Sequence, residues 1–210
     1  MKIFIVGIGG VTNGGKTTLA NKLLKILPNC SLIRQDDYFK PESEVETDER
    51  GFKQYDVLEA LEMEKMMLAV VSWITQHSRS ASPEEKSNLV PGRCENQVHF
   101  LIVEGFLLYQ YKPLDDVIDR RYFITVPYEE CKRRRSTRVY EPPDPPGYFD
   151  GHVWPMYIKH KDEMDTVHRE IVFIDGTKPQ EDILSFVYTD ITTNALIKKI
   201  RYSAPIREEN

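Results

Sequence analysis

The fold is decided by residues 3–27, which read IFIVGIGGVTNGGKTTLANKLLKIL. An apolar run is followed by a glycine-rich stretch and then by leucines at helical spacing, which predicts a buried strand, a turn and an amphipathic helix. Residues 10–17 fit the pattern G-x-x-x-x-G-K-[ST] of the phosphate-binding P-loop. The strand before the turn and the helix after it are the context that separates a genuine P-loop from a chance glycine-rich turn.

The chemistry of this turn suits a nucleoside triphosphate. Glycines let backbone N–H groups approach an anion, because no side chain blocks the way, and the following helix directs its unpaired N–H groups toward the same point. We expect Lys16 to reach the β- and γ-phosphates and to assist catalysis, and the Thr17 hydroxyl to bind Mg²⁺. The ATP-binding residues predicted in this segment are Gly10, Val11, Thr12, Asn13, Gly14, Gly15, Lys16, Thr17 and Thr18.

The composition is that of one cytoplasmic globular domain. The 210 residues suit a single domain, and hydrophobic residues make up 40% of them, enough for an ordinary core. The 28 basic and 33 acidic side chains give a net charge of −5, which argues against general nucleic-acid binding. The scattered cysteines form no C-x-x-C pair, so we expect reduced thiols and a cytoplasmic location. No segment is apolar over enough residues to cross a bilayer.

The rest of the chain alternates short apolar runs with segments of helical character. Strands are predicted at residues 31–33, 98–103, 122–126 and 171–174. Helices are predicted at residues 57–74, 128–138, 153–164 and 179–197. This alternation predicts an α/β fold, a doubly wound parallel sheet in a three-layer sandwich of the P-loop NTPase type.

Acidic residues follow two of the predicted strands. Asp36 comes after the second strand, and Glu104 ends the strand at 98–103. Ligands of open α/β sheets bind at the carboxyl ends of the strands, so both carboxylates should lie near the P-loop. Asp36 is placed to take a proton from a nucleophilic hydroxyl and to help hold the metal, whereas its neighbour Asp37 is better explained as a cap of a helix or turn. Glu104 is predicted to bind Mg²⁺ directly or through water.

A basic cluster at residues 132–138 precedes a proline-rich stretch at 141–147. On a helix over 128–138, Arg134 and Arg138 would lie one turn apart, with Arg135 close to both. Prolines prevent the helix from continuing. This layout indicates a lid that closes positive charge over a transferring γ-phosphate and excludes water; a solvated helix face or a nuclear-import signal is the alternative.

P-loop proteins include switch GTPases, motor and transport ATPases and small-molecule kinases. A GTPase usually adds an Asn/Thr-Lys-x-Asp motif, but Thr177-Lys178 is followed by Pro179-Gln180. The D-x-x-G match at residues 144–147 lies in a proline-rich loop and not after an apolar strand. The acid after the second strand and the basic lid therefore favour a kinase.

With these residues in place, the chain resembles the nicotinamide riboside kinases, relatives of the uridine kinases among P-loop nucleoside kinases. The resemblance runs from residue 2 to about residue 181. It rests on GVTNGGKTTL (10–19), PNC (28–30), QDDYFKP (35–41), QYDVLE (54–59), EGFLLY (104–109), PYEECK (127–132), RRSTRVY (134–140) and GHVWPMY (151–157).

This resemblance implies transfer of phosphate from ATP to the 5′-hydroxyl of nicotinamide riboside, and of nicotinic acid riboside, which feeds NAD synthesis. It implies that Asp36 is the base and, with Thr17, a metal ligand; Glu104 completes the predicted metal set. The implied additional ATP-binding residues are Arg134, Arg138 and Tyr140. The implied substrate-binding residues are Asp36, Tyr38, Phe39, Tyr55, Asp56, Arg135, Tyr140 and Glu141.

Within the implied substrate site, Asp56 and Arg135 would hold the ribose hydroxyls, and Tyr55 and Tyr140 would enclose the nicotinamide ring. A flat cationic pyridinium suits stacking between electron-rich phenol rings, and vicinal hydroxyls suit a carboxylate acting with a guanidinium. We expect a single kinase domain over residues 1–200.

Within that domain we expect a lid around residues 134–151 and a surface insertion at residues 77–97. A flexible tail at residues 201–210 should follow the domain.

Two alternative functions remain at this stage. One is a uridine or cytidine kinase. The other is a binding protein, for example in cell adhesion, that meets a protein partner through the insertion or tail and has secondary kinase activity.

Overall fold

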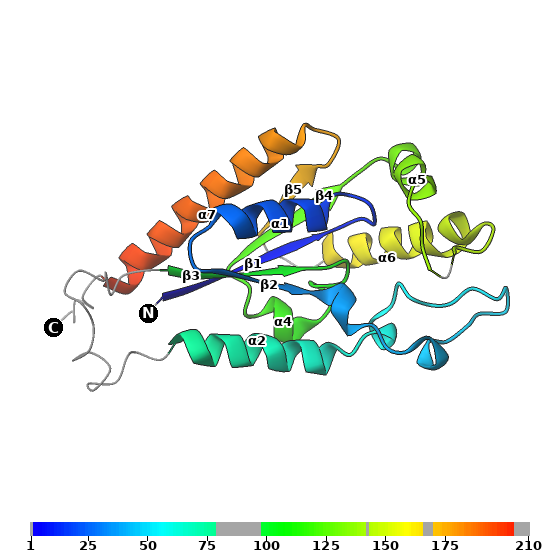
Figure 1. Ribbon diagram of the computed structural model, residues 1–210, viewed down its shortest axis with the longest axis horizontal. Helices are drawn as coiled ribbons and strands as arrows, with labels where there is room; N and C mark the ends of the chain where they lie inside the picture. Colours follow the sequence, from blue (N-terminus) through cyan, green and yellow to red (C-terminus); the bar gives the residue numbers. More distant parts are fainter. Residues whose placement is uncertain (1, 79–97, 142, 166–169, 204–210) are drawn as a thin grey trace.

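The computed structural model describes residues 2–78, 98–141, 143–165 and 170–203. Within them the chain forms one parallel sheet with the strand order β2-β3-β1-β4-β5 (Figure 1). The strands are β1 (Lys2–Gly10), β2 (Cys30–Arg34), β3 (Val98–Glu104), β4 (Arg120–Thr125) and β5 (Ile171–Asp175). The predicted α/β doubly wound sheet is confirmed, and the P-loop leaves its middle strand.

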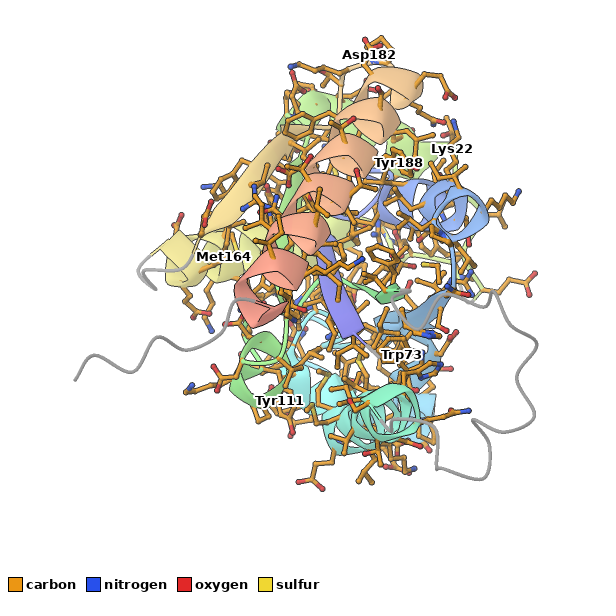
Figure 2. All side chains as sticks on the ribbon, turned by 90° about the vertical axis from the view of Figure 1, so that its left-hand side faces the viewer. Lys22, Trp73, Tyr111, Met164, Asp182 and Tyr188 are labelled. Carbon is orange, nitrogen blue, oxygen red and sulfur yellow. The ribbon has the colours of Figure 1, made fainter. Side chains whose placement is uncertain are left out.

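Helices cover both faces of this sheet. They are α1 (Lys16–Ile26), α2 (Met63–Ser78), α4 (Lys112–Asp115), α5 (Tyr128–Ser136), α6 (Trp154–Asp165) and α7 (Gln180–Ser203). Short turns of other helical types are η1 (Gln35–Tyr38), η2 (Glu42–Glu44), η3 (Leu58–Ala60) and the π-helical η4 (Phe149–Val153). Figure 2 shows Lys22 of α1 and Tyr188 of α7 on one side of the sheet, and Trp73 of α2 on the other.

The alternation of side chains along β1 explains these layers. Successive residues of a strand point to opposite faces. Val6 and Ile8 accordingly pack with Leu23 of α1 and Ile191 of α7, while Ile5 packs with the residues of α2. Because both faces of β1 are buried, the apolar run that opens the chain is continuous.

Several predicted boundaries were wrong. The helix predicted at 57–74 begins only at Met63 and continues to Ser78, because Leu61 is extended and forms a bridge with Phe39. The helix predicted at 128–138 ends at Ser136. The helix predicted at 179–197 continues to Ser203 and so includes the first residues of the predicted tail.

Two predicted segments fall largely outside the described residues. Of the predicted insertion, residues 77–78 belong to α2, and the remainder lies outside the described part of the chain. The same holds for residues 204–210. Among the helices that are described, none is both long and apolar enough to span a membrane.

The packing of β3 yields a stability prediction. Leu101 is fully buried against α2, whereas Leu68 on α2 is 68% exposed. Leu101→Ala removes buried methyl groups and leaves a cavity, so we expect it to lower the free energy of unfolding by about 3 kcal/mol. The same substitution at Leu68 should change it by less than about 0.5 kcal/mol. Urea unfolding measures both, and equal losses would contradict the placement of the core.

Candidate active site

The P-loop is shaped by close approach of β1 to β4. Gly10 has a φ of 135°, and a Cβ added there would lie 2.3 Å from the carbonyl oxygen of Ile124. The Val11 N–H donates to that same oxygen at 3.1 Å, and the Gly14 N–H donates to the Val11 carbonyl at 3.1 Å. Gly15, in the left-handed region with a φ of 99°, is the N-cap of α1. The N-terminus of α1 therefore points its free N–H groups into the turn.

Lys16 and Thr17, the first residues of α1, extend from this turn toward the acidic strand ends. The Lys16 ammonium donates to the Val11 carbonyl at 2.9 Å. Burial lowers the pKa of Lys16, and the negative charges of Asp36 and Glu104 oppose that shift. Lys16 therefore lies within the electrostatic reach of both predicted carboxylates.

Glu104, at the end of β3, is buried behind Thr17. The Thr17 hydroxyl donates to its Oε1 at 2.9 Å, and Arg34 Nε lies 3.8 Å from the same oxygen. Burial raises the pKa of Glu104. The positive charge of Lys16 and the hydrogen bond from Thr17 lower this pKa, and the negative charge of Asp36 raises it further. Thr17, Asp36 and Glu104 thus bring a hydroxyl and two carboxylates together beside the P-loop.

A cavity of about 930 Å³ opens beside the P-loop. Its wall contains most of the residues that the sequence pointed to: Gly10, Val11, Thr12, Asn13, Gly15, Lys16, Thr17, Thr18, Asp36, Phe39, Tyr55, Asp56, Arg134, Arg135, Arg138, Tyr140 and Glu141. Pockets for small ligands span roughly 300–1,000 Å³, so this volume suits a nucleoside together with phosphate groups.

Three predicted residues lie elsewhere. Gly14 lines a second pocket of about 100 Å³, with Arg134 and Gly176. Tyr38 packs against the apolar cluster beneath α2. Glu104 stands behind Thr17 and does not line the cavity.

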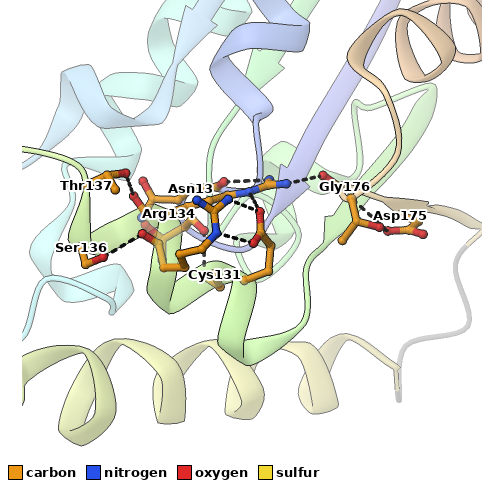
Figure 3. A network of polar contacts seen from close by, with 11 residues as sticks. Asn13, Cys131, Arg134, Ser136, Thr137, Asp175 and Gly176 are labelled. Atoms are coloured by element: carbon orange, nitrogen blue, oxygen red, sulfur yellow. Dashed lines mark hydrogen bonds and ion pairs between the residues drawn. The ribbon is translucent and has the colours of Figure 1, made fainter.

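The arginines of the predicted lid contact the P-loop. Arg134 donates to Glu130 at 2.7 Å and to the Gly176 carbonyl at 3.0 Å (Figure 3). Arg138 donates to the side chain of Asn13 at 3.3 Å. The prediction that Arg138 lies one helical turn beyond Arg134 was wrong, because α5 has already ended at Ser136. A turn after the helix brings Arg138 to the P-loop instead.

Arg135 joins the P-loop to the proline-rich loop. It forms a bidentate pair with Asp144 at 2.6 and 3.0 Å and donates to the Thr12 hydroxyl at 3.1 Å. Its guanidinium lies over the Tyr140 ring, 4.5 Å from the centroid. The Tyr140 hydroxyl is in turn 3.3 Å from the Asn13 amide oxygen. Asp144 was not predicted as a site residue. Its position in the proline-rich stretch that follows the arginines could have indicated it as an ion-pair partner for one of them.

Aromatic rings form another part of the cavity wall. Tyr55 meets the edge of Phe39 with ring centroids 5.6 Å apart, and Phe39 stacks on Phe106 at 5.7 Å. The buried Gln35 holds the backbone beneath them, since its amide oxygen accepts the N–H groups of Phe106 and Leu107 at 2.9 Å each. The sequence did not point to Phe106 or Gln35. Gln35 directly precedes Asp36, and Phe106 follows Glu104 by two residues, so in each motif the acidic residue carried the functional interpretation.

Comparison with known proteins identifies the family. The model of the AAA domain family matches residues 6–155. Rat and human nicotinamide riboside kinase 1 are 64% and 60% identical to this chain over 193 residues, which cover 91% of it and 95% and 93% of those proteins. Human nicotinamide riboside kinase 2 is 52% identical over 208 residues, covering 96% of this chain and 86% of that protein.

Solved structures share the fold at much lower identity. A sugar kinase from Janibacter has a TM-score of 0.53 at 12% identity, covering 92% of this chain and 98% of its own. A possible uridine kinase from Bacillus stearothermophilus has a TM-score of 0.50 at 16% identity, covering 83% and 90%. This chain belongs to the nicotinamide riboside kinase family, because it matches the P-loop domain model and is 60–64% identical to the rat and human nicotinamide riboside kinases 1.

Proposed function

We propose that this protein transfers the γ-phosphoryl group of ATP to the 5′-hydroxyl of nicotinamide riboside, giving nicotinamide mononucleotide, a precursor of NAD. Its rat and human relatives are named nicotinamide riboside kinases. One observation carries the proposal: a single cavity joins the P-loop and Asp36 to Tyr55, Asp56 and Arg135. Nicotinic acid riboside, which shares the ribose and a flat pyridine ring, is included as a second substrate.

ATP is assigned to the P-loop side of the site. Its phosphates would meet the N–H groups at the start of α1 and the ammonium of Lys16. The smaller pocket, lined by Thr18, Arg134 and Gly176, shares Thr18 and Arg134 with the large cavity and is a suitable place for the base. Arg134 and Arg138 would then both lie beside the phosphates, since both contact Asn13 of the P-loop.

The riboside is assigned to the side of the cavity that holds Asp56. Asp56 and Arg135 would bind the vicinal ribose hydroxyls, because a carboxylate accepts and a guanidinium donates hydrogen bonds. Tyr55 and Tyr140 offer phenol faces to the cationic ring. In this arrangement the 5′-hydroxyl points toward Asp36 and the P-loop.

The transfer step uses Asp36 as the base. Its carboxylate accepts the proton of the 5′-hydroxyl as the 5′-oxygen forms a bond to the γ-phosphorus. The bond from that phosphorus to the oxygen bridging it to the β-phosphate breaks, and ADP leaves with that oxygen. Lys16 and the arginines stabilise the charge on the equatorial oxygens, and the lid excludes water, which would otherwise compete as acceptor.

Thr17, Asp36 and Glu104 fit a magnesium ion. Mg²⁺ prefers oxygen ligands and usually takes one or two carboxylates, with water and substrate phosphates filling the other positions. The described residues contain no cluster of three His, Cys, Asp or Glu side chains, so no cage made only of protein ligands is present among them. When bound here, Mg²⁺ neutralises charge on the β- and γ-phosphates.

A cytoplasmic location is also part of the proposal, supported by the free thiols of Cys30 and Cys131.

Phosphate transfer from radiolabelled ATP to a panel of nucleosides tests the substrate. With nicotinamide riboside and uridine at equal concentration, we expect labelled nicotinamide mononucleotide to dominate, because the cationic ring gains a cation–π attraction from the phenol faces that the neutral pyrimidine lacks. Chelation of Mg²⁺ should abolish transfer. Preferential labelling of uridine or cytidine would replace the proposed substrate, and transfer to none of the nucleosides would remove the kinase assignment.

The role of Asp36 is tested by comparing it with its neighbour. Asp36→Asn keeps the shape of the side chain but cannot accept the proton, so we expect kcat to fall by about 100-fold or more while KM for the riboside changes little. Asp37 does not line the cavity, and Asp37→Asn should retain the original kcat. Steady-state kinetics at saturating ATP measures both. If Asp37→Asn caused the larger loss, the base would have to be reassigned.

A further inference from the structure

Asp56 lies in a loop that is packed tightly against η4. A Cβ added to Gly151 of η4 would come within 2.7 Å of the Phe52 ring. The Tyr148 hydroxyl donates to the Lys53 carbonyl at 2.6 Å. These contacts, made just before Asp56 in the chain, hold the loop and η4 together as one unit.

Two histidines, one from η4 and one from α6, lie close to Asp56. His160 of α6 places its Nε2 2.9 Å from the backbone carbonyl oxygen of Asp56, so the main chain there is fixed. His152 of η4 places its Nε2 3.4 Å from the Asp56 Oδ2. The backbone and the side chain of Asp56 are thus each met by a different imidazole.

The His152 ring is held in a single orientation. The residue is 2% exposed, and its ring stacks on Tyr148 with centroids 5.1 Å apart and an interplanar angle of 23°. Among the described residues no atom forms a hydrogen bond with its buried Nε2. Burying such a nitrogen without a partner is costly, and the Asp56 carboxylate is an acceptor only 3.4 Å away.

We propose that His152 is the residue that orients the Asp56 carboxylate for the ribose hydroxyls. A small approach of the two side chains turns the 3.4 Å contact into a hydrogen bond in which Nε2–H donates to Oδ2. Oδ2 is then held, and Oδ1 is left to accept from a hydroxyl of the substrate. Arg135, whose positive charge also acts on Asp56, supplies the matching donor. This inference rests on the proposed riboside substrate.

Paired substitutions at His152 test the contact. His152→Gln places an amide nitrogen near the position of Nε2, whereas His152→Asn places it near Nδ1 and leaves the Nε2 position empty. With nicotinamide riboside, we expect His152→Asn to raise KM roughly tenfold with little change in kcat, because a hydrogen bond to a charged group is lost. His152→Gln should stay close to the original KM. His99→Asn, on β3 at the sheet end away from the P-loop, is the matched control and should change neither constant.

A second substrate separates positioning from general packing. Nicotinamide 2′,3′-dideoxyriboside lacks both hydroxyls that Asp56 would bind, so the original protein and His152→Asn should use it with equal kcat/KM. A loss of the same size on both substrates, or equal KM values for the Gln and Asn variants, would overturn the inference. Asp56→Ala tests the contact from the other side, because it removes the acceptor: in that background His152→Gln and His152→Asn should no longer differ.

These outcomes keep the two proposals apart. If the unaltered protein phosphorylates nicotinamide riboside and the His152 variants match it, only the role of His152 falls. If the unaltered protein does not phosphorylate the riboside, the proposed function falls, and the role of His152 falls with it. Thermal unfolding of the His152→Gln and His152→Asn variants is compared first with that of the His99→Asn control. Equal midpoints show that any difference in KM does not come from a loss of folded protein.

Discussion

The contact between the β1–α1 turn and β4 is the constraint on which the rest of the site depends. The Cβ of any residue other than glycine at position 10 would overlap the Ile124 carbonyl, and the same carbonyl accepts the Val11 N–H at 3.1 Å. β4 therefore fixes where the turn lies and in which direction α1 begins. The positions of Lys16 and Thr17 follow from that direction, and so does the place where a phosphate chain can lie.

The cations of the site are already paired with protein oxygens. Lys16 donates to the Val11 carbonyl, Arg135 to Asp144 and Arg134 to Glu130. A phosphate or a ribose hydroxyl that binds these groups exchanges one hydrogen bond for another, so the gain in free energy is the difference between the two. The carboxylates of Glu130 and Asp144 also offset part of the repulsion between neighbouring positive charges. The predicted lid is thus held in place by the interactions that substrate binding would rearrange.

Sequence predicted best what depends on a contiguous pattern. The P-loop, the apolar strands and Asp36 at a strand end could all be placed, because a local motif fixes each one. The end of α5 at Ser136 could not, since Thr137 and Arg138 do not break a helix by propensity. The start of α2 was missed because a bridge between Phe39 and Leu61 holds the preceding residues extended.

Partners distant in the chain, such as Asp56 and His152, depend on tertiary packing that periodicity does not encode.

A structure determined with a non-hydrolysable ATP analogue and nicotinamide riboside tests the central claim most directly. We predict the γ-phosphate at the N-terminus of α1 and the Asp36 carboxylate within hydrogen-bond distance of the 5′-oxygen. A riboside bound outside the cavity, or an Asp36 carboxylate remote from that oxygen in the closed complex, would contradict the account.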